Sequence, residues 1–271
     1  ANSEVKVDTD TDTRTETDQN QQQQQHQQQQ NSNGGDDSNA NSNDVDVNID
    51  FGGGEWIPRD DDNIDIDGNV YTTITIGTQV WMVENLKTTK YRNGDPIQNV
   101  TDNSAWATLT KGAQCNYNNS EANGAKYGKL YNWHAVNDNR KLAPTGWHIP
   151  SDAEWTTLNN YLAANPGVSG SVVKAIAAKT DWISSTEANT VGNDLTKNNI
   201  SGFTALPGGI RGLDGPSGTF GWLNTNCWFW SSSASDVLFA NARGMSNTTK
   251  SNLQNGGFFK TDGLSVRCIK D

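Results

Sequence analysis

Hydrophobic and polar positions alternate along two stretches near the start of the chain. The first stretch begins with Val5 and Val7, has valine or threonine at every odd position up to Thr17, and carries a charge at every even position between them. The second stretch, residues 45–51, has four apolar side chains at alternate positions: Val45, Val47, Ile49 and Phe51. A period of two predicts β-strands that each gather their apolar or β-branched side chains on one face.

Neither strand can be stable by itself, because its backbone groups and its apolar face need a partner sheet. We therefore expect the 45–51 strand to dock either on the remainder of its own chain or on a second copy, and a disordered segment is the third alternative. The 5–17 strand is the alternative candidate for docking on a second copy. Gly52-Gly53-Gly54 ends the second strand.

A third alternating pattern begins at Asn63. Ile64 and Ile66 flank Asp65, residues 67–69 supply an Asp-Gly-Asn turn, and a strand is predicted from Val70 to Ile76, so the segment is typical of a hairpin. The stretch from Asp65 also resembles the start of a calcium-binding loop. An EF-hand loop needs a glutamate at its far end, and the chain has Ile76 there, so calcium is not expected.

Helical periodicity is clearest after Pro150. Ser151 and Glu154 have the spacing of a capping box, and Trp155, Leu158 and Leu162 form one apolar stripe. The predicted helix ends before Pro166-Gly167, and a second helix is predicted over 171–178. Beyond residue 180 we expect only short strands and Gly/Asn-rich loops, with a last strand over 264–269.

Composition divides the chain into two domains between residues 62 and 63, where the third alternating pattern begins. Residues 1–62 are rich in Thr, Gln, Asn and Asp and carry a net charge of −12, whereas residues 63–271 carry +1. The first part predicts an extended low-complexity arm, and the second is long enough for one folded core. The acidic arm argues against a nucleic-acid partner. No apolar run reaches the length of a membrane span. The chain begins at Ala1 rather than Met, as expected for a processed protein.

Three cysteines are present, and their spacing fits no zinc motif. In an oxidising compartment one disulfide and one free thiol are compatible with this number. Three buried free thiols are the alternative. If a bridge forms, we expect it between Cys115 and Cys268.

Several motifs follow one another along the second domain. They are Asp67–Tyr71, Trp81–Thr89, Tyr127–Trp133, Ala143–Trp155, Leu206–Arg211, Trp230–Ser233 and Ser265–Cys268. Their order and spacing resemble those of the Fibrobacter succinogenes major paralogous domain, over residues 63–271. This family implies an α+β fold related to C-type lectins and to the formylglycine-generating enzyme, here with short twisted antiparallel strands and two helices. It also implies a secreted or surface protein of Bacteroidota-like bacteria.

Two positions depart from the pattern of this family. Many members have cysteine where this chain has Ala143, and Cys227 stands where a small or aromatic residue is more usual. The arm lies outside the family pattern.

No set of residues predicts catalysis. His134 and His148 each lie next to a tryptophan in a family motif, where a structural role is the expectation, and the capping box accounts for Glu154. The related formylglycine-generating enzymes hold copper with paired cysteines, and no two cysteines are close in this sequence. We therefore expect no enzyme activity, no cofactor and no metal.

Glycans are the alternative partner. Sugar rings stack on aromatic side chains, and Trp222, Trp228 and Phe229 lie in the half where lectin-like folds place their ligand loops. The sugar-binding tripeptides Glu-Pro-Asn and Gln-Pro-Asp do not occur in the chain. Covalent glycans are a further expectation. Their candidate sites are Thr9, Thr11, Thr13, Asn99, Asn118, Asn199 and Asn247.

Together these features predict a secreted, non-enzymatic surface protein that assembles with copies of itself into a fibre through the arm. The alternative is a glycan-binding module for which the arm is only a spacer.

Overall fold

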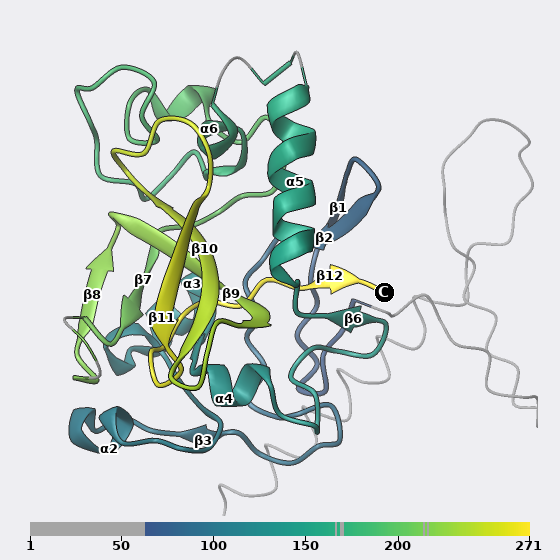
Figure 1. Ribbon diagram of the computed structural model, residues 1–271, viewed down its shortest axis with the longest axis vertical. Coiled ribbons are helices and arrows are strands. Elements are labelled where there is room, and N and C mark those ends of the chain that lie inside the picture. The colour runs from purple at the N-terminus through teal and green to yellow at the C-terminus, as the bar shows by residue number, and fades with distance from the viewer. Residues whose placement is uncertain (1–62, 166, 169–170, 214, 216) are drawn as a thin grey trace, which may run out of the picture. The chain divides into compact units, whose positions relative to one another are not determined.

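The computed structural model describes residues 63–165, 167–168, 171–213, 215 and 217–271 (Figure 1). The predictions for the arm therefore lie outside the described residues. They include both predicted strands, 5–17 and 45–51, and the threonines proposed as glycan sites. The chain divides into two units, residues 1–55 and 56–271.

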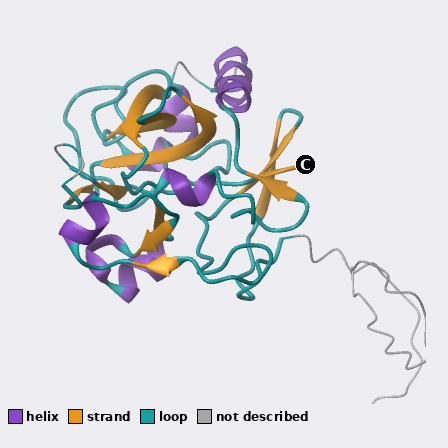
Figure 2. Cartoon of the chain, turned by 60° about the horizontal axis from the view of Figure 1, so that its bottom comes forward, coloured by secondary structure: helices purple, strands orange, loops and turns teal. Residues whose placement is uncertain are grey.

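The described part is an α+β fold built from many short elements joined by loops (Figure 2). Its α-helices are α2 (Asn103–Ala107), α3 (Glu121–Tyr127), α4 (Trp133–Val136), α5 (Asp152–Ala164) and α6 (Val172–Ile176). Its strands are β1 (Thr73–Ile76), β2 (Gln79–Met82), β3 (Gln98–Asn99), β4 (Ala113–Cys115), β5 (Leu130–Tyr131), β6 (Trp147–His148), β7 (Gly208–Arg211), β8 (Phe220–Leu223), β9 (Asn226–Ala234), β10 (Phe239–Ser246), β11 (Gln254–Phe259) and β12 (Ile269–Lys270).

These strands form four small sheets. One sheet has the order β1-β2-β12-β6 and brings the C-terminal strand beside the first hairpin and β6 (Figure 1). The others have the orders β11-β10-β9, β3-β4-β5 and β7-β8. The strand pairs are antiparallel except β3 with β4, which are parallel.

Helix α5 confirms the capping box. The Ser151 hydroxyl accepts from the Glu154 N–H, and the Glu154 carboxylate accepts from the Ser151 N–H at 2.7 Å. Trp155, Leu158 and Leu162 are all buried, so the predicted stripe faces the core. These signals are local, and a cap together with a buried stripe is sufficient to define a helix.

Three predictions about secondary structure need correction. The described residues contain five α-helices rather than two, although α6 lies inside the predicted 171–178 helix. Beyond residue 180 the strands are not all short, since β9 has nine residues and β10 has eight. The last strand covers only Ile269–Lys270, and Leu264 and Ser265 make isolated bridges instead.

The predicted hairpin after Asn63 is confirmed only as a single bridge between Ile64 and Val70. The Asp65 carboxylate organises this turn. It accepts hydrogen bonds from the N–H groups of Asp67 and Asn69, the Asn69 side chain and the Tyr71 hydroxyl. A buried carboxylate that accepts this many hydrogen bonds fixes the local backbone.

The core consists of three apolar clusters, and each contains one cysteine. Cys268 lies in the cluster around Trp147, Cys227 in the cluster around Trp155, and Cys115 in the cluster around Trp106. All three thiols are buried and free. The predicted Cys115–Cys268 disulfide is therefore not formed in the structure, which has the alternative of three buried free thiols.

Aromatic side chains form the centre of the second cluster. Trp155 packs against Trp81 with ring centroids 4.8 Å apart and against Phe229 at 5.5 Å, and Phe203 meets both tryptophans edge-on. Tilted and edge-to-face arrangements are the favourable ones for such rings. Helix α5 is thereby joined to β2 and β9, which are distant in sequence.

Candidate functional site

The three aromatic residues predicted to contact glycans are not together on the surface. Phe229 is fully buried and Trp228 is 8% exposed, because β9 is covered on both of its faces. For these two residues the prediction is wrong. Trp222 of β8 is 41% exposed and is the one that can meet a ligand.

Trp222 stands on an unusual and firmly held backbone. Its φ is +63°, and Asn224 has φ +62°, a region that costs a bulky residue on the order of 1–2 kcal/mol. The Thr225 N–H and hydroxyl both donate to the Trp222 carbonyl. The Asn224 side chain accepts from the Tyr127 hydroxyl at 3.0 Å. These bonds hold the backbone of the turn, and the Trp222 indole is exposed on it.

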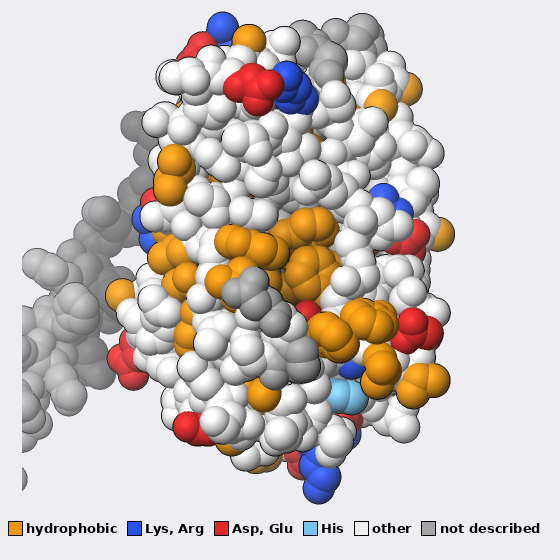
Figure 3. Space-filling model, turned by 60° about the vertical axis from the view of Figure 1, so that its left-hand side comes forward, with side chains coloured by type: hydrophobic (Ala, Val, Ile, Leu, Met, Phe, Trp, Pro, Cys, Tyr) orange, Lys and Arg blue, Asp and Glu red, His pale blue; other side chains and the backbone are white. Residues whose placement is uncertain are grey.

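Apolar side chains gather across the middle of the face that carries β8 (Figure 3). On β8 itself, Phe220 and Leu223 are partly exposed beside the more exposed Trp222. Isolated apolar residues on a surface need no explanation, whereas a gathered set marks a place where another molecule can bind.

An open polar hollow of about 450 Å³ lies beside Phe220. Two successive asparagines on its rim, Asn118 and Asn119, have left-handed backbone with φ of 52° and 54°. An aromatic ring beside amide, carboxylate and hydroxyl groups is suited to a polyhydroxylated ligand. The hollow is lined by Thr101, Asp102, Asn103, Asn118, Asn119 and Phe220.

Arg211 contacts three of the residues that line this hollow, Thr101, Asn103 and Phe220. Its fully buried guanidinium donates to the carbonyls of Val100, Thr101 and Gly218 and to the Asn103 side chain. It also lies 4.7 Å from the centre of the Phe220 ring. All of these contacts are structural, so Arg211 positions the hollow rather than binding a ligand.

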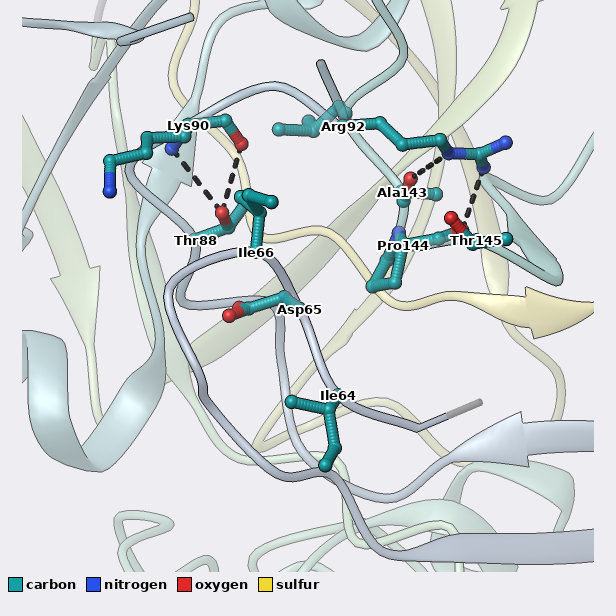
Figure 4. Close-up of a pocket in the computed structure, with 10 residues that line it drawn as sticks. Ile64, Asp65, Ile66, Thr88, Lys90, Arg92, Ala143, Pro144 and Thr145 are labelled. Carbon is teal, nitrogen blue, oxygen red and sulfur yellow. Dashed lines mark hydrogen bonds between the residues drawn. The ribbon is translucent and has the colours of Figure 1, made fainter. Parts of the chain in front are cut away.

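A smaller pocket of about 180 Å³ lies between the Asp65 turn and residues 142–145 (Figure 4). Its basic residues are partly engaged: Lys90 pairs with Asp67 at 3.1 Å. Arg92 donates to the carbonyls of Ala143, Pro144 and Trp147. These contacts link the loops that line the pocket.

His148 lies between two carboxylates. Its Nδ1 is 2.7 Å from Asp271 and its Nε2 is 2.8 Å from Glu154. Burial alone would lower the pKa of His148, but the hydrogen bonds to Glu154 and Asp271 outweigh burial and raise it. Because both ring nitrogens are engaged, this histidine cannot act as a free base in the arrangement described.

His134 differs from His148, since burial and the nearby Lys260 lower its pKa. A neutral imidazole beside a lysine is an ordinary structural arrangement. No group of three or more His, Cys, Asp or Glu that could hold a metal ion occurs among the residues that the structure describes.

Sequence reasoning missed Asp262. This carboxyl is 4% exposed, Oδ2 accepts from the Phe259 N–H at 3.0 Å, and Oδ1 has no partner. Burial raises the pKa of Asp262 to about 7. Nothing in the sequence distinguishes this aspartate from a turn residue, because its burial comes from the packing of distant loops.

The predicted glycosylation asparagines lie in different surroundings. Asn99 and Asn118 are exposed. The Asn199 side chain bonds both the N–H and the hydroxyl of Thr204, and the Asn247 side chain donates to Ile183 at 3.4 Å. Attachment of a glycan stays a prediction at all four.

Comparison with known proteins identifies the family. The model of the Fibrobacter succinogenes major domain matches residues 74–270, which is most of the chain. The chain therefore belongs to this family, as its motifs predicted. No curated protein and no solved structure matches the chain. Among the described residues, no helix is long and apolar enough to cross a membrane.

Proposed function

We propose that the protein is a secreted structural subunit of an extracellular bacterial filament, joined head to tail through its N-terminal arm, residues 1–62. The observation that carries this proposal is that sheets of the folded domain end in exposed strands. β1 and β11 each stand at the edge of a sheet and contain exposed residues. An exposed edge can accept one further strand.

The arm has the pattern that such an edge accepts. Val45, Val47, Ile49 and Phe51 would cover apolar surface, and the backbone between them would complete a ladder of hydrogen bonds. When a segment of one copy docks on a different surface of the next, the contact need not close into a ring, and it then propagates as a filament.

The location and the finer fold belong to the same proposal. The family resemblance implies a secreted or surface protein and a C-type-lectin-like domain. The small antiparallel sheets and loop-rich architecture are compatible with that fold. An experimental structure of the domain, compared with known lectin domains, would test it. We further propose that the protein is not an enzyme.

Electron microscopy of the full chain beside two variants tests the assembly. We expect filaments from the full chain and none from a chain that begins at Asn63. Val47→Asp with Ile49→Asp should also abolish filaments, because it places charge on the apolar face. Asn48→Ser, on the polar face, is the matched control and should assemble normally. Filaments from the shortened chain would refute the proposal, and filaments from the double variant would exclude the 45–51 segment.

A second candidate function is glycan binding. The specific observation in its favour is the exposed Trp222 on a rigid turn, on the β8 strand that also contributes Phe220 to the polar hollow. Binding of the full chain to a glycan array would be lost in Trp222→Ala. It should be retained in Ile200→Ala, which removes an apolar side chain that is 65% exposed elsewhere. Absence of binding by the natural chain would exclude this function.

A further inference from the structure

We propose that the edge of β11 receives the 45–51 segment of a second copy, with the apolar face of that segment on the Phe258 side of the sheet. This inference rests on the proposed function above and names the surface that the arm would occupy.

The register of β11 shows which backbone groups face outward. β11 pairs with β10 in an antiparallel register that places Phe258 opposite Ala240, and the same register continues to Lys260, whose N–H donates to the Leu238 carbonyl. Since hydrogen-bonded pairs alternate along such a ladder, the groups of Asn255 and Gly257 point away from β10. Both residues are exposed.

The outward ladder has a defined end. The Phe259 N–H, the next outward donor, is occupied by the Asp262 carboxylate at 3.0 Å. An added strand therefore has the edge from Gln254 to Phe258 available. Strands rise about 3.3 Å per residue, so these five residues span about 17 Å, and the seven-residue arm segment is long enough to cover them with about one residue to spare at each end.

The features that usually protect an edge strand are absent from β11. Its sequence, Gln-Asn-Gly-Gly-Phe-Phe, has no charged residue and no proline. Natural edge strands are normally protected by lysine, proline or a bulge. Among the other exposed edges of the described sheets, β1 has four residues and β3 has two, against six in β11, so both offer a shorter ladder.

The two faces of β11 differ in the way that an amphipathic strand requires. One face is closely packed against Trp228. A Cβ atom added at Gly256 would lie 2.9 Å from its indole, and the centre of the Phe258 ring lies 4.8 Å from the centre of that indole. Phe258 is only partly buried, so apolar surface remains there. On the other face, a Cβ at Gly257 would have no neighbour within 4 Å. Apolar arm residues fit the first face, and the polar ones between them would lie on the open face.

Cross-linking in the full chain tests this placement. Chains carrying Asn48→Cys are mixed with chains carrying Asn255→Cys and oxidised, and both new thiols would lie on the open face of the joined strands. The natural thiols are buried and should stay unreactive. We expect a disulfide-linked dimer from the mixture only.

Gln254→Cys is the matched control, since residue 254 is equally exposed but points to the opposite face of the sheet. We expect it to give about tenfold less cross-linked dimer, because only side chains on the same face of neighbouring strands are within reach. Equal cross-linking at both positions, or no dimer while filaments form, would overturn the inference. A link confined within a single chain that carries both cysteines would overturn it as well, because the arm would then dock on its own domain.

Proline substitution gives an independent measurement. Asn255→Pro removes an outward donor and places a ring on the edge, while the pairing with β10 is retained. We expect the protein concentration needed for filaments to rise by about tenfold or more, through the lost hydrogen bond and the steric block. Thr75→Pro makes the same change at an outward position of β1 and should assemble like the natural chain.

The outcomes separate this inference from the proposed function. If the chain that begins at Asn63 still forms filaments, the proposed function fails. If the arm is required but Asn255→Pro assembles normally and the cross-link does not form, only the choice of β11 fails. If Thr75→Pro rather than Asn255→Pro abolishes filaments, the acceptor is β1. Should Asn255→Pro fail to fold, the cross-linking result decides.

Discussion

Two separate regions of the domain are each organised by one buried arginine, and the two regions differ in what surrounds that arginine. Arg267 and Arg211 are both fully buried, and each donates to three backbone carbonyls and one asparagine side chain. Each guanidinium also lies over two aromatic rings. A buried cation that satisfies its donors on loop carbonyls joins segments that short strands cannot join.

The buried charge of Arg267 is compensated by hydrogen-bond acceptors and aromatic rings. Its acceptors are Met82, Asn85, Phe203 and Thr204, and its guanidinium lies over the rings of Phe203 and Phe229 in the second cluster. Burial lowers the pKa of Arg267 to about 9, which leaves the group charged near neutral pH. The chain that follows is fastened to β6 and α5 through Asp271, His148 and Glu154.

The surroundings of Arg211 are less complete. It contacts residues that line an open hollow, and the next residue, Gly212, lies against Asp262, whose carboxyl lacks a partner for one oxygen. The Arg267 centre therefore stabilises the core. The Arg211 centre supports an accessible surface, and the buried Asp262 carboxyl with its unpartnered oxygen is the energetic cost of that arrangement. We therefore expect the two regions to respond differently to substitution.

The largest expected effect is at Arg267. Arg267→Met should lower the free energy of unfolding by about 3–5 kcal/mol, because three carbonyls and the Asn85 side chain lose their donors while buried. Urea unfolding measures this loss. Arg267→Lys keeps the charge but not the planar fork, and it should still cost about 2 kcal/mol. Stability equal to that of the natural chain in the lysine variant would show that charge alone matters.

A smaller loss is expected at Arg211. Arg211→Met should cost about 2–3 kcal/mol, since part of its site lies close to solvent. Hydrogen exchange should increase around Val100, Thr101 and Asn103, whose carbonyls or side chain accept hydrogen bonds from this arginine, and not in residues 82–85. If both segments exchange faster together, the two arginine centres form one cooperative unit and the contrast between them disappears.

The energetic cost of burying the Asp262 carboxyl can be measured through the pH dependence of stability. Its folded pKa, about 7, lies above the ordinary value of 3.8. The folded state therefore binds the proton more tightly, and stability falls as pH rises between these two values. Asp262→Asn should raise the free energy of unfolding at about pH 8 by up to about 4 kcal/mol and change it little near pH 4. The measurement is urea unfolding at both pH values.

The smallest effect is expected at His148, on the Arg267 side. Its pKa is raised in the folded state, so its contribution is present below the ordinary value of 6.5 and is lost as pH rises through the folded value. Because His148 is partly exposed, His148→Gln should cost only about 0.5–1 kcal/mol at low pH. Unfolding at about pH 5.5 and pH 9 would detect the difference. A loss that is independent of pH would mean that the histidine acts through packing alone.

The sequence predicted those parts of the fold whose signals are local. The capping box of Ser151 and Glu154 and the stripe through Trp155 defined α5, because a cap and a helical period are both read within a few residues. The family was likewise identified from its motifs. The strand β9 was missed because it is buried on both faces, so its run of Cys227, Trp228 and Phe229 does not alternate.

The candidate site was less predictable than the fold. Of the three aromatic residues predicted to contact glycans, only Trp222 is exposed. The hollow beside Phe220 is lined by residues 101–103 and 118–119, which no local sequence pattern brings together. Arg211 and Arg267 stood inside the family motifs, yet arginine in a sequence normally indicates surface. Only packing between distant loops reveals that both are buried.

The distribution of cysteine over the core gives the domain three built-in reporters of its own motions. Each thiol is inert while its cluster is closed and becomes reactive when that cluster opens. Alkylation rates at Cys115, Cys227 and Cys268, followed by mass spectrometry, would therefore measure the opening of each cluster separately without any substitution. Equal rates would mean that the domain opens as a whole. A faster rate at Cys115 would mean that the cluster around Trp106 opens more readily than the other two.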